Sequence, residues 1–193
     1  MKRLSSWVQL VIAVFGLVPL LAVAGAAQAA ESPYTALEDR SIKALSAEQI
    51  EGYETGQGMG FALAAELNGY PGPKHVLDLG SELGLSEAQL GSTEKAFADM
   101  KESAEDLGGQ IVTLERELDQ LFASHAIGAE NLATQVAQIA RLQGKLRTVH
   151  LRAHLVMMGI LNHDQIRRYI ELRGYHGGEH QGHHPDGEQG GHP

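Results

Sequence analysis

Two histidines four residues apart, with a methionine four residues further on, are the side chains in this sequence best suited to bind a metal. They lie in the stretch HLRAHLVMM as His150, His154 and Met158. Residues four apart share one face of a helix, so both imidazoles could chelate one ion without distorting the backbone. Two imidazoles bind weakly and need a further ligand. The alternative is that both are half-buried helix residues satisfied by hydrogen bonds.

The residues around this pair are apolar nearly all round the helix. We therefore expect this part of the helix to be enclosed, where an unpaired imidazole is unfavourable. Met157 and Met158 fit the role of ordinary core residues, with Met158 as a thioether ligand in the alternative. A thioether favours copper(I) or a tuned nickel or cobalt site. Imidazole and carboxylate donors suit zinc, nickel or copper(II) equally.

The elements that position these side chains are predicted to be helices, because helical spacing recurs from Ser41 to about Leu172 without an alternating strand pattern. One apolar seam has steps of three and four: Phe97, Met100, Ala104, Leu107, Ile111, Leu114, Leu118 and Leu121. A second seam has the same steps: Ile139, Leu142, Leu146, Val149, Ala153, Val156 and Ile160. The break between them, at 124–130, is short, so the two helices should fold back antiparallel.

Turn residues delimit shorter helices before this hairpin. Asn68-Gly69 is typical of a helix end, Pro73 suits the first turn of the next helix, and Gly84 ends that helix. Within the first long helix, Gly108-Gly109 allows either a bend or a close approach of another helix. The predicted fold is all-α, with two or three short helices packed on a long hairpin and a short final helix.

The first residues are typical of an export signal. Two basic residues precede a long apolar run that ends in Ala27-Gln28-Ala29, an A-x-A cleavage site. We assign residues 1–29 to this signal, although the run is also long enough for a retained membrane anchor. The chain has no cysteine, which excludes disulfides, lipoprotein anchoring at the cleavage site and thiolate metal sites. A formal net charge of −9 argues against nucleic acid as a partner.

The last residues, 174–193, differ in kind from the helical domain at 41–173. They are rich in glycine and histidine and hold no large apolar residue beyond Tyr175, so we predict a disordered tail. Its histidines either form a low-affinity metal sponge or are incidental to a solubilising terminus. They are His176, His180, His183, His184 and His192.

Three short stretches share one helix-start signal. LSAEQ, LSEAQ and LNHDQ, at 45–49, 85–89 and 161–165, each place a serine or asparagine three residues before a glutamine. This is the spacing of a capping box, in which the two side chains satisfy each other's backbone amides. Read singly, each stretch indicates a good helix start and nothing more.

The stretches at 85 and 161, taken with the export signal, the lack of cysteine and the hairpin, resemble the L-T-x-x-Q repeats of the CpxP/Spy family. This family comprises small, all-helical periplasmic proteins, including stress chaperones and heavy-metal sensors of the ZraP and CnrX types. The stretch ELNGYPGPKHVLDLGSELGLS, which begins at residue 66, resembles the metal-sensor branch. The resemblance implies a periplasmic location and a homodimer whose helical hairpins form a cradle.

The resemblance also implies a ligand set. In the CnrX type, histidines from an early helix, a glutamate from the first long helix and a His-x-x-x-Met pair hold the metal. Here His154 and Met158 match the pair, His75 matches an early histidine, and Glu94 is the nearest carboxylate. The expected second early histidine is replaced by Leu79, so the sequence departs from the pattern there.

Two functions follow as expectations. In one, the protein binds zinc, nickel or copper through His75, His150 and His154, and senses or buffers that metal together with a membrane sensor kinase or an anti-sigma factor. In the other, it is an ATP-independent chaperone for unfolded envelope proteins, and metal binding is incidental. No H-E-x-x-H, G-x-S-x-G or phosphate-loop motif is present, so we do not expect an enzyme.

Overall fold

The computed structural model describes residues 32–175 of the chain. These residues form six α-helices and one 3-10 helix and contain no strand, which confirms the all-helical prediction. The predicted export signal and the five tail histidines lie outside the described residues.

The chain divides into two compact units, residues 1–35 and 36–193. In the first unit, the described residues form a turn in which the amide and hydroxyl of Thr35 both donate to the Ser32 carbonyl. The 3-10 helix η1 (Thr35–Leu37) begins at this turn. All six α-helices belong to the second unit.

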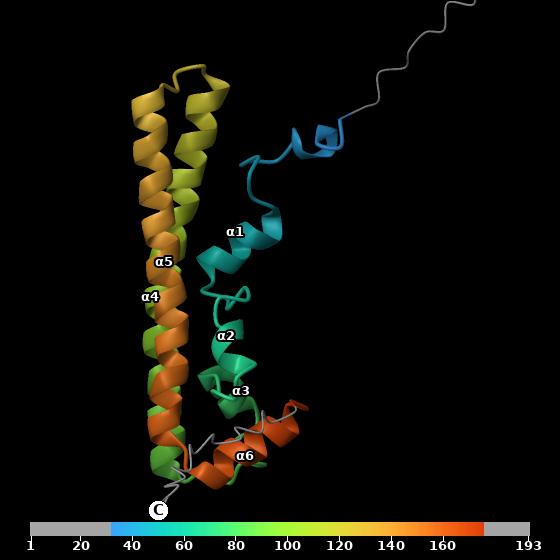
Figure 1. The fold of residues 1–193 in the computed structure, drawn as a ribbon, viewed down its shortest axis with the longest axis vertical. Helices are drawn as coiled ribbons and strands as arrows, with labels where there is room; N and C mark the ends of the chain where they lie inside the picture. The colour runs from blue at the N-terminus through green and yellow to red at the C-terminus, as the bar shows by residue number, and fades with distance from the viewer. Residues whose placement is uncertain (1–31, 176–193) are drawn as a thin grey trace, which may run out of the picture. The chain divides into compact units, whose positions relative to one another are not determined.

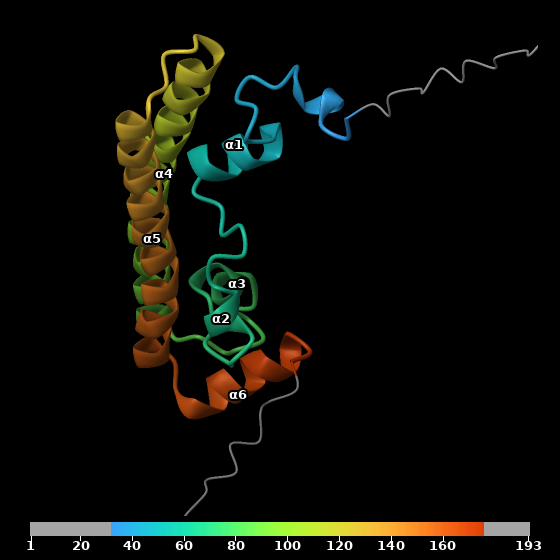
Figure 2. The same cartoon turned by 45° about the horizontal axis from the view of Figure 1, so that its top comes forward.

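The second unit is built on a hairpin of two long helices, α4 (Glu87–Ala123) and α5 (Ala129–Ile160). The two helices run side by side and are joined by a short loop at one end (Figures 1 and 2). This loop falls where the sequence predicted the break. Ile111 and Leu146, which belong to the two predicted seams, are fully buried, as the antiparallel arrangement requires.

Shorter helices flank the hairpin on one side, and a final helix crosses near the end opposite the loop (Figures 1 and 2). They are α1 (Ala47–Glu54), α2 (Leu63–Glu66), α3 (Pro73–Asp78) and α6 (His163–Leu172). This arrangement confirms the predicted short helices and short final helix.

The ends of the short helices follow the turn residues in most respects. Pro73 is the first residue of α3, where its missing N–H is tolerated. Gly69 follows α2 with a φ of 79°, a conformation that favours glycine. The helix α3 ends at Asp78, earlier than predicted, and a turn continues to Gly84, which has a φ of 61°.

Two apolar clusters hold the short helices to the hairpin. The cluster nearer the middle of the hairpin joins α1 and the residues before it to both long helices: Ile42, Leu45, Tyr53, Ala104, Ile111, Val112 and Leu146. The second cluster joins α3, the turn after it, the end of α5 and α6: Val76, Leu83, Met157, Leu161 and Tyr169. Burial of apolar surface in these clusters is the main force that fixes the short helices in place.

All three predicted capping boxes are present. Their serine or asparagine side chain accepts from the glutamine amide, and the glutamine side chain accepts from the cap amide, at Ser46–Gln49, Ser86–Gln89 and Asn162–Gln165. Each box therefore begins a helix, as the sequence predicted: α1, α4 and α6.

The second and third capping boxes are also joined to each other. Gln89 donates to Gln165 Oε1 at 2.8 Å, and Gln165 donates back to Gln89 Oε1 at 3.0 Å. The Gln89 amide group also donates to the Ile160 carbonyl at 2.9 Å. Hydrogen bonds thus join the starts of α4 and α6 to each other, and the start of α4 to the end of α5.

Gly108 permits a close approach between α1 and α4. The helix α4 continues through both glycines. A Cβ atom at Gly108 would lie 2.0 Å from the Tyr53 carbonyl oxygen, whereas one at Gly109 would meet no atom within 4 Å. Of the two roles that the sequence left open for this pair, close approach is the one that the structure supports.

One expectation about α5 is wrong in part. The stretch around the two histidines is not enclosed on all sides, because Leu155 is 61% exposed and Val156 is 44% exposed. Met157, in contrast, is fully buried. The covering helices lie on one side of the hairpin, so only the face of α5 that carries His150, His154 and Met157 is covered.

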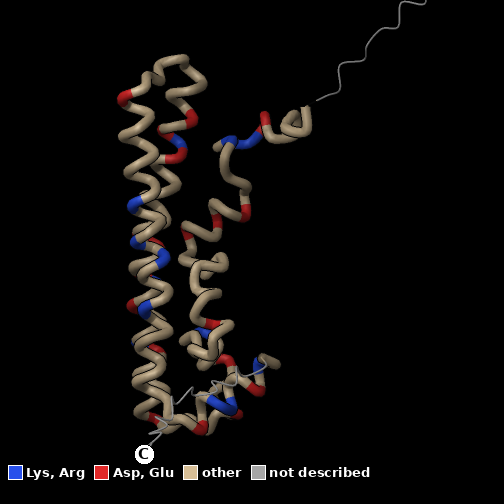
Figure 3. Tube along the Cα trace, in the orientation of Figure 1, with Lys and Arg blue, Asp and Glu red and all other residues tan. Residues whose placement is uncertain are grey.

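Charged residues of both signs are interspersed along the hairpin and α6 (Figure 3). Several form exposed pairs one helical turn apart, such as Lys95 with Asp99 and Lys101 with Glu105. Pairs of this kind contribute little to stability, because water screens them. Within residues 32–175, no helix combines the length and the apolar character needed to cross a membrane.

Replacing Gly108 with alanine should destabilise the fold by about 3 kcal/mol, because the new methyl group would force α1 away from α4. Gly109→Ala is the matched control and should raise stability by about 1 kcal/mol through helix propensity alone. Urea unfolding monitored by circular dichroism measures both changes. Equal effects of the two substitutions would contradict the close approach at Gly108.

Candidate functional site

A cavity of about 620 Å³ lies where α2, α3, α4, α5 and the loop after α1 meet. The three histidines that the sequence singled out, His75, His150 and His154, all line it. The same cavity is lined by Glu66 from α2. The fold therefore brings four side chains to a shared space, one from α2, one from α3 and two from α5.

His150 is buried with an unused ring nitrogen. The residue is 3% exposed, and its Nε2 has no hydrogen-bond partner. The imidazole stacks on the Phe61 ring, with centroids 5.7 Å apart and planes inclined by 12°. Burial, assisted by the neighbouring His154, lowers the pKa of His150. The neutral imidazole is therefore favoured, which is the form that binds metals.

His154 is oriented by a backbone contact. Its Nδ1 lies 2.8 Å from the Tyr70 carbonyl oxygen, and because a carbonyl only accepts, Nδ1 donates. In the neutral imidazole this tautomer leaves a lone pair on Nε2. Gly72 makes room for the ring, since a Cβ there would lie 2.9 Å from His154 Cε1. Such a second contact is the usual way in which a metal-binding histidine is held in place.

Glu66 is the buried carboxylate of the site. It is 7% exposed, and its Oε1 accepts hydrogen bonds from the Tyr169 hydroxyl at 2.6 Å, Arg173 Nε at 3.1 Å and the Tyr175 hydroxyl at 3.0 Å. Its Oε2 is buried without a hydrogen-bond partner. That oxygen lies 3.8 Å from His154 Nδ1, which already donates to Tyr70. One oxygen is thus fully used and the other is unsatisfied.

His75 lies on α3 at the more open part of the cavity. Its side chain is 38% exposed, and Nδ1 is 3.8 Å from Asp78 Oδ2. Partial burial of the imidazole lowers the pKa of His75, and the positive charge of Arg173 lowers it further. His75 therefore faces the same cavity as the pair on α5 while keeping access to solvent.

Thioether groups also reach this cavity, but not the predicted one. Met59, which has a φ of 41°, and Met100 line the cavity. Met158 is 37% exposed and does not line it. Glu94 is exposed on α4 and is likewise absent from its walls. Met158 and Glu94, which the family resemblance added to the ligand set, therefore do not lie with the histidines in this cavity.

The donor types in the cavity fit a borderline divalent metal, since imidazole and carboxylate groups suit zinc, nickel and copper(II). Two donor atoms, His150 Nε2 and Glu66 Oε2, are buried and unsatisfied. No three His, Asp or Glu side chains in residues 32–175, however, are close enough to hold an ion together. A bound ion would therefore require some of these side chains to move toward one another.

Glu66 was not predicted from the sequence to be a site residue. It is the only charged residue in the stretch FALAAELNGY, and a carboxylate in such apolar surroundings is a signal of burial with a partner. Its partners follow more than a hundred residues later, at Tyr169, Arg173 and Tyr175. No spacing rule connects residues so far apart.

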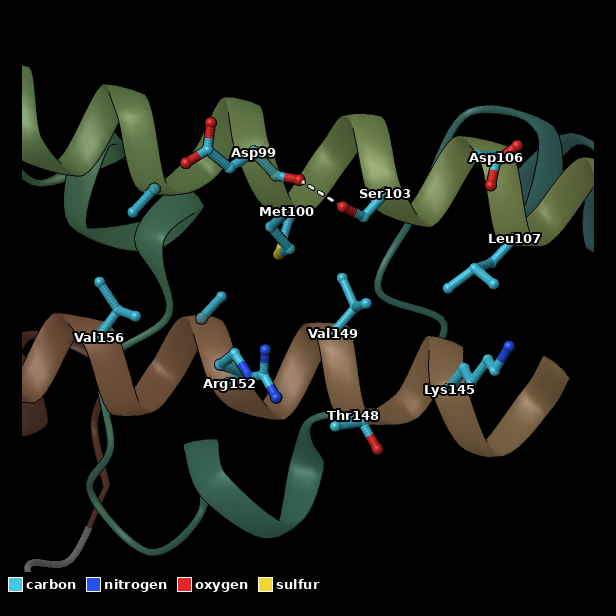
Figure 4. A pocket seen from close by; sticks show the side chains of 12 residues that line it. Asp99, Met100, Ser103, Asp106, Leu107, Lys145, Thr148, Val149, Arg152 and Val156 are labelled. Atoms are coloured by element: carbon cyan, nitrogen blue, oxygen red, sulfur yellow. Dashed lines mark hydrogen bonds between the residues drawn. The ribbon is translucent and has the colours of Figure 1, made fainter. Parts of the chain in front are cut away.

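A second concave surface lies on another face of the hairpin. This groove, of about 680 Å³, runs between α4 and α5. Met100, Leu107, Val149 and Val156 point into it from the two helices (Figure 4). Its edges carry charged residues of opposite sign, acidic on α4 and basic on α5: Asp99, Asp106, Lys145 and Arg152.

Comparison of the chain with protein-family models, with curated proteins and with solved structures gives no match. Membership of the CpxP/Spy family therefore stays a prediction from the sequence. The contacts within the cavity and the groove are the observations from which a function can be proposed.

The lowered pKa of His150 predicts a loss of stability in mild acid. An unfolded histidine has a pKa of about 6.5. Below that pH the unfolded chain binds a proton more readily than the folded chain, so folding is opposed by up to about 1.4 kcal/mol per pH unit until the folded pKa is reached. Thermal unfolding between pH 7.5 and pH 5 should show this dependence.

His150→Leu should unfold with a shallower pH dependence over that range, because the buried titrating group is removed. His163→Gln is the control, since His163 is exposed and should leave the pH dependence as it is in the wild type. If wild type and His150→Leu lose stability in parallel, His150 does not titrate in this range.

Proposed function

We propose that the protein binds a transition-metal ion in the cavity between α2, α3 and α5, and thereby senses or buffers that metal outside the cytoplasm. The observation that carries this proposal is the pair of buried, unsatisfied donor atoms, His150 Nε2 and Glu66 Oε2, in one cavity. A buried polar atom without a partner is unfavourable by about 1–3 kcal/mol. A bound ion would give both atoms a partner.

His150, His154 and Glu66 would hold the ion, with His75 as the ligand closest to solvent. The ion would supply a charge that satisfies the unused oxygen and ring nitrogens at once. Zinc, nickel and copper(II) are the candidates, because the donors are imidazole and carboxylate. Met59 and Met100 line the same cavity and extend the choice to copper(I).

The ion would link side chains that belong to three different helices. His75 belongs to α3, Glu66 to α2 and the histidine pair to α5. Drawing these side chains together would tie the short helices to the hairpin and shift the population toward one packing. A dimer partner, a membrane sensor kinase or an anti-sigma factor could read that change, as the resemblance to periplasmic metal sensors implies.

The metal proposal is tested by calorimetric titration of zinc, nickel and copper(II) into a chain shortened after Tyr175, which lacks the tail histidines. We expect one site per chain, and a roughly 100-fold or greater loss of affinity in the His150→Ala/His154→Ala double variant, since two donors are gone. The matched control is His125→Gln/His163→Gln, which removes two histidines outside the cavity. Equal affinity of the double variant and its control would refute the site.

A second function, binding of unfolded envelope proteins without ATP, is favoured by the groove between α4 and α5. Its apolar floor and its charged edges of both signs would accept extended segments of many sequences. Val156, which lines the groove, is 44% exposed and is therefore accessible to such a segment. In this function the cavity on the other side would be incidental.

The groove is tested by suppression of client aggregation. Val156→Asp places a charge on the groove floor and should reduce suppression at least about threefold, because apolar contact area is lost. Leu155→Asp is the control on the neighbouring position, which is exposed but does not line the groove. Retained suppression by both variants would exclude the groove as the client site.

A further inference from the structure

Glu66 joins the cavity to the C-terminal end of α6 through its two oxygens. Oε1 accepts from the side chains of Tyr169, Arg173 and Tyr175. Oε2 has no hydrogen-bond partner and lies near the His154 ring. The negative charge of Glu66 is therefore shared between the cavity and the end of α6. A cation that attracts this charge toward Oε2 would weaken the hydrogen bonds that Oε1 accepts.

The contacts at Oε1 differ in how firmly they are held. Tyr169 is fully buried in the second apolar cluster, so its ring is fixed by packing as well as by its hydrogen bond. Arg173 is 31% exposed at its side chain and bonds to the Tyr175 hydroxyl at 3.1 Å. Arg173 also lies over the Tyr175 ring, 5.6 Å from its centroid. Residues 173–175 thus depend on Glu66 more than Tyr169 does.

We propose that a divalent cation bound at Glu66 Oε2 and the docking of residues 173–175 oppose each other. This inference rests on the proposed metal-binding function. A cation on Oε2 would withdraw charge from Oε1 and would place a second positive group beside the Arg173 guanidinium. Because the carboxylate is 7% exposed, little water is present to screen that repulsion.

If cation binding disfavours the docking of residues 173–175, docking must equally disfavour cation binding. Release of these residues must then strengthen cation binding by the same factor. Loss of the Arg173 charge favours that release and should therefore strengthen cation binding. Arg173 also helps to order Glu66, so its removal would by itself weaken cation binding, because the carboxylate would be less well positioned. The repulsion between a divalent ion and a guanidinium that share one buried carboxylate is the larger effect, and it sets the sign. Cation binding is thereby transmitted to the end of α6.

The affinity arm of the test uses zinc, the full-length chain and competition with a chromophoric chelator. Arg173→Gln should bind zinc roughly tenfold more tightly than the wild type, within the usual range of coupling between sites. Arg168→Gln is the matched control, because it removes the same charge from α6, the helix that Arg173 follows, and Arg168 pairs with exposed Glu171. The control should bind like the wild type, and the tail histidines are common to all variants.

The second arm measures amide hydrogen exchange at the end of α6, where the Tyr175 amide donates to the Ile170 carbonyl at 3.0 Å. Zinc should accelerate exchange of residues 173–175 in the wild type. In Arg173→Gln exchange should be fast without zinc, and in Glu66→Gln zinc should have no effect there.

The outcomes separate this inference from the function on which it rests. If zinc binds through the histidine pair but exchange at 173–175 slows or stays constant, or if Arg173→Gln binds zinc no more tightly than Arg168→Gln, the opposition is wrong and the metal site stands. If the His150→Ala/His154→Ala variant binds zinc as the wild type does, the metal site itself is wrong, and the opposition is wrong with it. Should Glu66→Gln fail to fold, the comparison of Arg173→Gln with Arg168→Gln decides.

Discussion

The burial of one carboxylate organises the part of the molecule in which the short helices meet the hairpin. Removing an ionised carboxylate from water is unfavourable by several kcal/mol unless hydrogen bonds and an opposite charge compensate it. Glu66 receives that compensation from Tyr169, Arg173 and Tyr175, all from one end of α6 or just beyond it. The same Tyr169 hydroxyl accepts from the Gly72 amide at 3.4 Å, so the chain between α2 and α3 is held as well.

The hairpin carries two surfaces of different chemistry. On the side covered by the short helices, polar and ionisable groups surround a cavity, and on another face an apolar groove is open. Met100 lines both of them and projects between α4 and α5 (Figure 4). The two candidate functions therefore draw on opposite sides of one thin two-helix layer, and a shift in the spacing of α4 and α5 would change both surfaces together.

Local patterns in the sequence predicted most of the fold. The capping boxes marked the starts of α1, α4 and α6, and the apolar steps of three and four marked both long helices, because these signals act within a few residues. The identity of the covered face was harder to predict. Met157 and Met158 are adjacent and chemically equal, yet only the first faces the short helices and is buried. That difference depends on where other elements dock.

The candidate site shows the same limit. The sequence placed His75, His150 and His154 in one set, and the fold brings all three to one cavity. The family resemblance added Met158 and, as the nearest carboxylate, Glu94, and neither of them lines the cavity with the histidines. Glu66 was missed because its role is defined by partners at the far end of the chain. Gly108 and Gly109 are likewise equal in helix propensity, and only the position of Tyr53 distinguishes them.

The reciprocal bond between Gln89 and Gln165 has a consequence for the order in which the molecule can be completed. The two glutamines are separated by 76 positions in the chain. During synthesis the start of α4 leaves the ribosome long before its partner exists, and its side-chain amide must bond to water until α6 arrives. The first long helix can therefore form early but gains its final anchor last, and a nascent chain that stops short of residue 165 lacks the contact that closes the base of the hairpin.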